Sequence, residues 1–168
     1  MKSLKNIAIA ILTILVITSC KKDDGLTKPT QIGANTFSCK INGKTFVTKS
    51  TLFGPDPIFV GYYTGANPRF IIEGSNNSSQ PYISIRMEVD GIITKGTYML
   101  ENSPTFGSLE YRYPNDLYKT TSGQKGEVTF TRVDPSAKIY SGTFSFSAVN
   151  SAGGIINVTN GRFDVKVQ

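Results

Sequence analysis

The chain has 168 residues, with 18 Lys and Arg against 12 Asp and Glu, a formal net charge of +6, no His, no Trp and two Cys. The missing His excludes His-based metal sites and His-containing catalytic triads, and two Cys allow at most one disulfide. The charges are spread along the chain without the basic clusters typical of a nucleic-acid surface, so no nucleic-acid partner is expected.

The first nineteen residues have the pattern of an export signal. Lys2 and Lys5 precede an apolar run, Ile7–Ile17, that only Thr13 interrupts. As a helix this run spans about 16 Å, about half of a bilayer's hydrocarbon core, so it predicts a cleaved signal peptide at 1–19 and no permanent membrane span. Its removal takes away two Lys and leaves 16 basic and 12 acidic residues, a net charge of +4.

A cysteine directly follows the apolar run. The sequence Ile17-Thr18-Ser19-Cys20 resembles a bacterial lipobox. The resemblance implies cleavage between Ser19 and Cys20 and acyl chains on Cys20, which would anchor the mature protein to the membrane through lipid.

The residues after this cysteine indicate where in the cell the protein is located. Lys21 and the following Lys22-Asp23-Asp24 resemble the lysine and acidic-pair signal of surface-exposed lipoproteins in Bacteroidetes-type bacteria. The resemblance implies an outer-membrane protein on the cell surface; the periplasmic face of that membrane is the alternative. Residues 21–35 are polar and show no periodicity, which predicts a flexible tether. Segment 20–35 would then consist of the lipidated Cys20 and this tether.

The mature chain is expected to be a single all-β domain at 36–168. From residue 21 onward it contains 55 Ile, Val, Thr, Phe and Tyr but only 10 Leu and Ala, and all 16 Gly and 8 Pro lie there between short apolar runs. The candidate strands are 37–41, 44–48, 58–63, 69–73, 82–89, 96–100, 109–113, 127–133, 142–149, 155–159 and 162–167. Many short strands predict an antiparallel β-sandwich or a flattened barrel.

Tight turns and alternation add detail to this prediction. Asn42-Gly43 predicts a two-residue hairpin that places Cys39 opposite Phe46, with Cys39 buried as a core residue. Asn160-Gly161 offers a second tight turn. Alternation predicts that two sets of residues face the core: Ile83, Ile85, Met87 and Val89, and Phe144, Phe146 and Ala148.

Two segments carry candidate chemistry. Glu88 and Asp90 share one strand face, a spacing that could suit paired carboxylates of a polysaccharide-active enzyme, but a solvated strand face beside Arg86 is the simpler explanation. The segment Leu109–Lys119 combines aromatic rings with hydrogen-bonding groups, which suits a sugar or a protein partner, although inward-facing strand residues and a polar loop would give the same pattern. Its candidate ligand-binding residues are Tyr111, Arg112, Tyr113, Asn115, Asp116 and Tyr118.

Three segments carry a family resemblance. Cys39–Phe46 (CKINGKTF), Ser141–Phe146 (SGTFSF) and Val158–Val165 (VTNGRFDV) resemble landmarks of small uncharacterised lipoproteins of Bacteroidetes-type bacteria. The resemblance implies a β fold and a lipid anchor, and it brings no catalytic residues.

Together these features favour a membrane-anchored, non-enzymatic β-domain that binds a glycan or an envelope protein. No catalytic residue, metal or cofactor is expected. The alternative is an enzyme that acts on envelope polysaccharide through Glu88 and Asp90.

Overall fold

The computed structural model describes residues 24–49, 56–78, 80–112 and 115–167. The predicted cleavage and lipidation residues Ser19 and Cys20, the export residues Lys22 and Asp23, and Tyr113 lie outside this part of the chain. The described residues form eleven strands and no helix long and apolar enough to cross a membrane. The strands are β1 (Thr36–Ile41), β2 (Lys44–Val47), β3 (Ile58–Tyr63), β4 (Arg69–Asn76), β5 (Ile83–Asp90), β6 (Gly96–Leu100), β7 (Phe106–Arg112), β8 (Asn115–Lys119), β9 (Gly126–Asp134), β10 (Ile139–Val149) and β11 (Ile155–Lys166).

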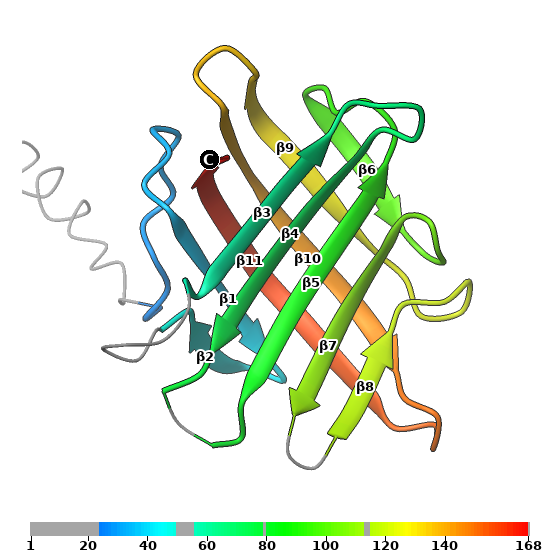
Figure 1. Cartoon of the computed structure of the whole chain (residues 1–168). Helices are drawn as coiled ribbons and strands as arrows, with labels where there is room; N and C mark the ends of the chain where they lie inside the picture. The colour runs from blue at the N-terminus through cyan, green and yellow to red at the C-terminus, as the bar shows by residue number, and fades with distance from the viewer. Residues whose placement is uncertain (1–23, 50–55, 79, 113–114, 168) are drawn as a thin grey trace, which may run out of the picture.

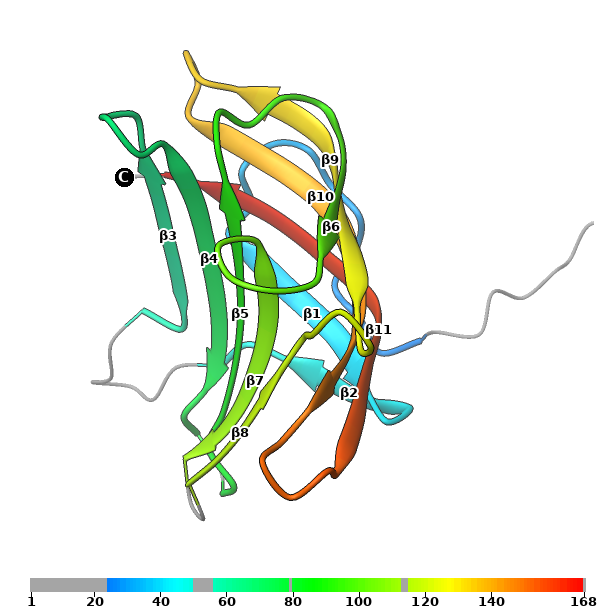
Figure 2. The same cartoon turned by 90° about the vertical axis from the view of Figure 1, so that its right-hand side faces the viewer.

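The strands form one antiparallel sheet that curls into a half-barrel with two layers, which confirms the predicted all-β class (Figures 1 and 2). The front layer has the strand order β8-β7-β5-β4-β3, and the back layer has the order β2-β1-β11-β10-β9-β6. The layers join where Val149 at the end of β10 pairs with Lys119 of β8.

Aromatic rings from both layers fill the space between them. Phe70 of β4 packs against Phe130 of β9 and Tyr140 of β10, with ring centroids 5.2 and 5.0 Å apart. Phe37 of β1 occupies the place where a β-carbon on Gly74 of β4 would lie, so the backbone of the front layer approaches this ring closely. These contacts fix the two layers against each other.

The predicted hairpin and the predicted alternation are confirmed. Asn42 and Gly43 both have positive φ angles, 46° and 81°, as a type I′ turn requires, and Cys39 pairs with Phe46. Cys39 is fully buried, and burial raises the pKa of its thiol to about 12. The inward residues of β5 and β10 are buried as expected, namely Ile85, Met87 and Val89, and Phe144, Phe146 and Ala148, while Ile83 at the start of β5 is only partly buried against the core.

The second predicted tight turn is wrong. Asn160 and Gly161 lie within the continuous strand β11, where the register with β1 and β10 shifts and Asn160 has a φ of 53°. The ring of Phe144 lies where a β-carbon on Gly161 would sit, so glycine is needed here for room in a bulge. A further difference is β8, a strand formed by residues that the sequence assigned to a polar loop.

The structure also differs from the expectation of a free tether. Residues 24–35, hereafter the strap, run along the outer face of the back layer. Thr27 hydrogen-bonds the side chain of Ser38, and Asn35 accepts a hydrogen bond from the backbone N–H of Lys166. The strap thereby covers Ser38 and Asp164, outward-facing residues that are only 0% and 1% exposed.

The carboxylate of Asp164 holds the strap in place. It accepts hydrogen bonds from the hydroxyl of Thr30 (2.6 Å) and the backbone N–H groups of Ile32, Gly33 and Ala34 (3.0, 2.9 and 3.1 Å). Ser141 of β10 donates a fifth, of 2.7 Å. Burial by itself would raise the pKa of Asp164, but the donated hydrogen bonds outweigh it and lower the pKa from 3.8 to about 2.

Replacement of Asp164 by Asn is expected to lower the free energy of unfolding by about 3 kcal/mol at pH 7, because a charged acceptor of several hydrogen bonds is lost. Because the pKa of Asp164 is lower in the native state than in the unfolded chain, the ionised carboxylate stabilises the native protein above about pH 4. This stabilisation, about 2 kcal/mol, is lost as the pH falls from about 4 to 2 and the carboxylate is protonated. Urea unfolding of the variant should therefore show a weaker pH dependence in this range, and limited proteolysis should cut its strap faster.

The matched control is Glu101→Gln, which removes a surface carboxylate that pairs with Lys125 and has no contact with the strap. It should change the free energy of unfolding little, because it removes only a solvent-exposed ion pair, and it should leave the strap protected. Equal stability losses in the two variants would contradict this role of Asp164.

Candidate functional site

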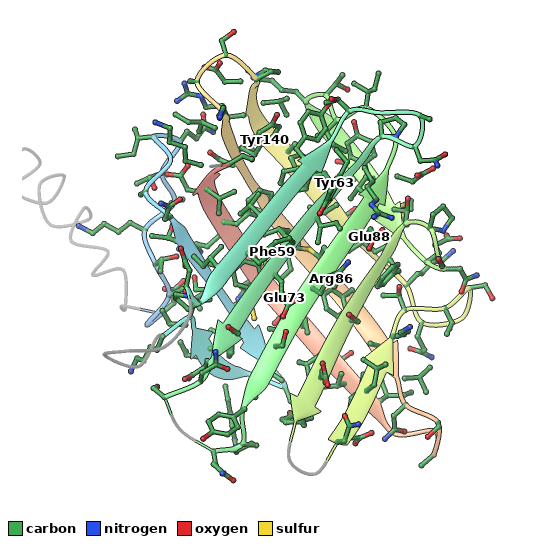
Figure 3. The ribbon with its side chains drawn as sticks, in the orientation of Figure 1. Phe59, Tyr63, Glu73, Arg86, Glu88 and Tyr140 are labelled. Carbon is green, nitrogen blue, oxygen red and sulfur yellow. The ribbon has the colours of Figure 1, made fainter. Side chains whose placement is uncertain are left out.

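The outer face of the front layer presents the most binding-competent group of side chains (Figure 3). Phe59 and Tyr63 come from the edge strand β3, and charged residues come from β4 and β5, beside them in the sheet. We call this surface the front platform, which consists of Phe59, Gly61, Tyr63, Arg69, Glu73, Arg86 and Glu88.

Two solvent-exposed rings form one half of the front platform. Phe59 and Tyr63 are 49% and 44% exposed, although both are large apolar side chains. A β-carbon on Gly61, which lies between them, would be 2.9 Å from the Tyr63 ring and 3.4 Å from the Phe59 ring. The bare backbone at Gly61 thus lets both rings lean over the strand, and the guanidinium of Arg69 lies 5.0 Å from the Tyr63 ring centroid.

An ion-pair network forms the other half. Arg86 lies between two carboxylates, with Nη2 2.8 Å from Glu88 Oε2 and Nη1 3.7 Å from Glu73 Oε2. The other oxygen of Glu88 lies 3.7 Å from Arg69, and Ser84 donates a 2.5 Å hydrogen bond to Glu73. This network holds long polar side chains in defined positions next to the rings, so that fewer rotamers would have to be ordered by a ligand.

The predicted carboxylate pair is placed on this outer face, but the two residues have different neighbours. Both oxygens of Glu88 face arginine nitrogens. Asp90, at the exposed end of β5, pairs across the sheet with Arg69, and its backbone N–H bonds the hydroxyl of Thr105. Glu88 is therefore built into the network and has no oxygen left without a cation beside it.

The tyrosine segment lies at the corner where β7 and β8 meet β10. The rings of Tyr111 and Tyr118 meet edge to face with centroids 6.2 Å apart, and both pack partly against the core. Asp116 accepts two hydrogen bonds, 3.0 and 3.2 Å, from the side-chain amide of Asn150, a residue that the sequence reasoning missed. Arg112 and Asn115 pair across the end of the hairpin.

The polar groups of this corner influence each other's protonation. A hydrogen bond to Asp116, followed by burial and the charge of the carboxylate, raises the pKa of Tyr118. Burial and the same charge raise the pKa of Tyr111. Tyr111 also lines a hollow of about 310 Å³ between the layers, together with Ile41, Phe46 and Ile83. The corner thus joins a polar cluster to the apolar interior.

No local pattern in the sequence marks the front platform. In Ile58–Tyr63 every residue except Gly61 is apolar or aromatic, so alternation alone did not separate an inner face from an outer one. The edge position of β3 leaves one side of the platform open and makes Phe59 and Tyr63 accessible. That position could not be read before the strand order was known.

In the described part of the chain, no group of three Cys, Asp or Glu side chains could hold a metal ion. A large hollow, about 1050 Å³, lies on the opposite side of the molecule between the strap and the outer face of β9–β11. Its lining includes hydroxyl side chains, and its aromatic residue, Phe144, is buried, whereas the two rings of the front platform are exposed.

Comparison with known proteins adds one match. A family model described as a domain of unknown function (DUF6252) matches residues 60–166, which contain most of the front platform and both strands that hold the strap-binding residues Ser141 and Asp164. No curated protein and no solved structure gives a significant match.

Replacement of Asp116 by Asn is expected to lower the pKa of Tyr118 towards the ordinary value of 10, because the carboxylate's hydrogen bond and charge both favour the neutral phenol. The pKa of Tyr111 should fall less, since burial is the larger cause of its shift. The ultraviolet absorbance of tyrosinate, followed in a pH titration, measures both. Glu110→Gln, which removes a charge from the opposite face of β7, is the control and should leave the curve unchanged; an unchanged curve for Asp116→Asn would refute the coupling.

Proposed function

The chain belongs to the DUF6252 family of domains of unknown function, and we propose that it is a lipid-anchored, non-enzymatic binding module of the bacterial outer membrane whose front platform binds glycans. The observation that carries this proposal is the pair of exposed rings, Phe59 and Tyr63, next to an ordered network of arginine and glutamate side chains.

This combination matches the chemistry of a sugar ring. One face of a pyranose is a patch of C–H groups that stacks on an aromatic ring, while its rim carries hydroxyls that need donors and acceptors. Phe59 and Tyr63 supply the rings, and Arg86, Glu73 and Glu88 supply both kinds of hydrogen-bonding group. Because the ion pairs already fix these side chains, binding a sugar costs little conformational entropy.

The non-enzymatic part of the proposal rests on the state of the carboxylates. A glycosidase needs two carboxyl groups that flank the bond to be cut, with one of them free to donate a proton. Glu88 and Glu73 both bind Arg86 instead, and Asp90 lies at the end of the strand beside Arg69. The arrangement suits holding a ligand better than cleaving one.

The lipid anchor is supported by the sequence Ile17–Cys20 and by its position just before the strap. Two or three acyl chains on one cysteine would retain the domain on a bilayer far longer than a single chain. The acidic pair that follows favours the cell surface over the periplasmic face.

Replacement of Cys20 by Ala is expected to move the protein from the membrane fraction to the soluble fraction, because the acyl chains then have no attachment site. Cell fractionation and metabolic labelling with a fatty-acid analogue measure both effects. Cys39→Ala is the matched control, since this buried thiol is not exposed to a modifying enzyme, and it should remain membrane-bound. Unchanged partition and labelling of the Cys20 variant would refute the anchor.

Phe59→Ala and Tyr63→Ala are each expected to weaken glycan binding about tenfold or more, because each removes a stacking surface of the platform. Affinities for purified neutral and acidic polysaccharides, screened on an array and then measured by calorimetry, would show the effect. Both side chains are about half exposed, so thermal stability should change little.

Leu117→Ala provides the control, as Leu117 is 45% exposed on the same layer but belongs to β8. It should leave the affinity unchanged. Failure of the wild-type domain to bind any polysaccharide on the array, or equal losses in all three variants, would refute the platform as a glycan site.

A further inference from the structure

The strap fixes the point at which the chain leaves the domain. Asp24, its first residue, forms an ion pair with Arg162 on the outer face of β11, and its carbonyl oxygen accepts a hydrogen bond from Thr45 of β2. Arg162 also donates a 2.9 Å hydrogen bond to the carbonyl of Thr27. The chain therefore leaves from the outer face of the back layer, on the side of the molecule opposite the front platform (Figure 2).

This exit point is very close in sequence to the proposed anchor. Only three residues, 21–23, separate Cys20 from Asp24. A fully extended chain gains at most about 3.6 Å per residue, so Asp24 lies within about 14 Å of an acylated Cys20. A free tether of fifteen residues would reach about 50 Å and would leave the orientation of the domain open. The docked strap shortens this connection severalfold.

The surface around the exit point has suitable chemistry for lipid headgroups. Lys28 is exposed on the strap. The hydrogen bond from the backbone N–H of Leu26 lowers the pKa of Asp24 most; the hydrogen bond from Arg162 and the nearby charge of Lys40 on β1 lower it further. Beside them is the hollow of about 1050 Å³, lined by Thr129, Thr143 and Ser145. Glu127 is an acidic member of this lining, while the charge of Asp24 is balanced by Arg162.

We infer that the outer face of the back layer lies against the anionic headgroups of the membrane and that the front platform points away from it. The inference rests on the lipid anchor of the proposed function and adds the orientation of the domain. The short connection sets the orientation, and basic residues near the exit point add electrostatic attraction to anionic lipid. The hollow beside the strap then takes up headgroups, and the platform stays accessible to polysaccharide.

Depth-dependent fluorescence quenching tests this orientation. Glu127→Cys places a label on the outer face of the back layer, and Leu117→Cys places one on the outer face of the front layer. Cys39 is fully buried and Cys20 carries the acyl chains, so only the new thiol reacts. The acylated full chain, verified by mass, is inserted into phosphatidylcholine vesicles with phosphatidylglycerol and a lipid that carries a nitroxide on its headgroup.

The label at position 127 should be quenched at least twice as strongly as the label at 117, because one lies on the face turned to the headgroups and the other on the face turned away from them. Vesicles without phosphatidylglycerol should reduce the difference. A ten-residue Gly/Ser insertion between Asp23 and Asp24 leaves the folded domain intact but lengthens the connection, and it should bring the two values close together.

Equal quenching of the two labels in vesicle-bound wild-type protein would overturn the inference, as would stronger quenching at position 117. A difference that persists unchanged after the insertion would also overturn it, since the short connection would then not be the cause. Failure of the wild-type chain to float with vesicles at all would instead refute the lipid anchor, so the two proposals fail in distinguishable ways.

Discussion

A carboxylate that is removed from water must be surrounded by hydrogen-bond donors, and Asp164 meets this requirement with residues that lie far apart in sequence. Four of its five donors come from residues 30–34 and the fifth from Ser141. The charge is thus satisfied only when the strap lies on the back layer. The course of the strap, the exit point at Asp24 and the cover over Ser38 all follow from this requirement.

The aromatic core has the complementary role of fixing one layer relative to the other. Phe70 reaches from the front layer to Phe130 and Tyr140 of the back layer, and Phe37 of the back layer fits against Gly74. Such packing is rigid, because protein interiors have the density of organic crystals. The strap exit at Asp24 and the front platform are consequently held on opposite sides of one rigid body, while the other end of the strap, at Asn35, lines a hollow together with Phe59.

Most of the fold could be predicted because its signals are local. Asn42-Gly43 adopts the positive φ angles of its turn, and alternation in β5 and β10 identifies the buried residues. Asn160-Gly161 has the same local signal but serves a bulge, since the neighbouring ring of Phe144, distant in sequence, decides its role. The strap was missed for the same reason, as a polar segment such as 24–35 looks unstructured until its acceptor, Asp164, is known. The front platform depends on strand order, which no local pattern contains.

The two surfaces of the molecule differ in a way that fits their proposed surroundings. On the front platform the charges neutralise each other, with Arg86 between Glu73 and Glu88. This face would therefore bind a ligand through shape and hydrogen bonds more than through net charge. Near the strap exit, Lys28 and Lys40 add positive charge that an anionic surface would attract. A domain oriented in this way loses its rotational freedom when it is anchored. Binding a glycan afterwards would not have to restrict the domain's orientation again, because the front platform already faces away from the membrane. In the proposed orientation, the docked strap would therefore favour ligand binding by fixing the direction in which the front platform faces.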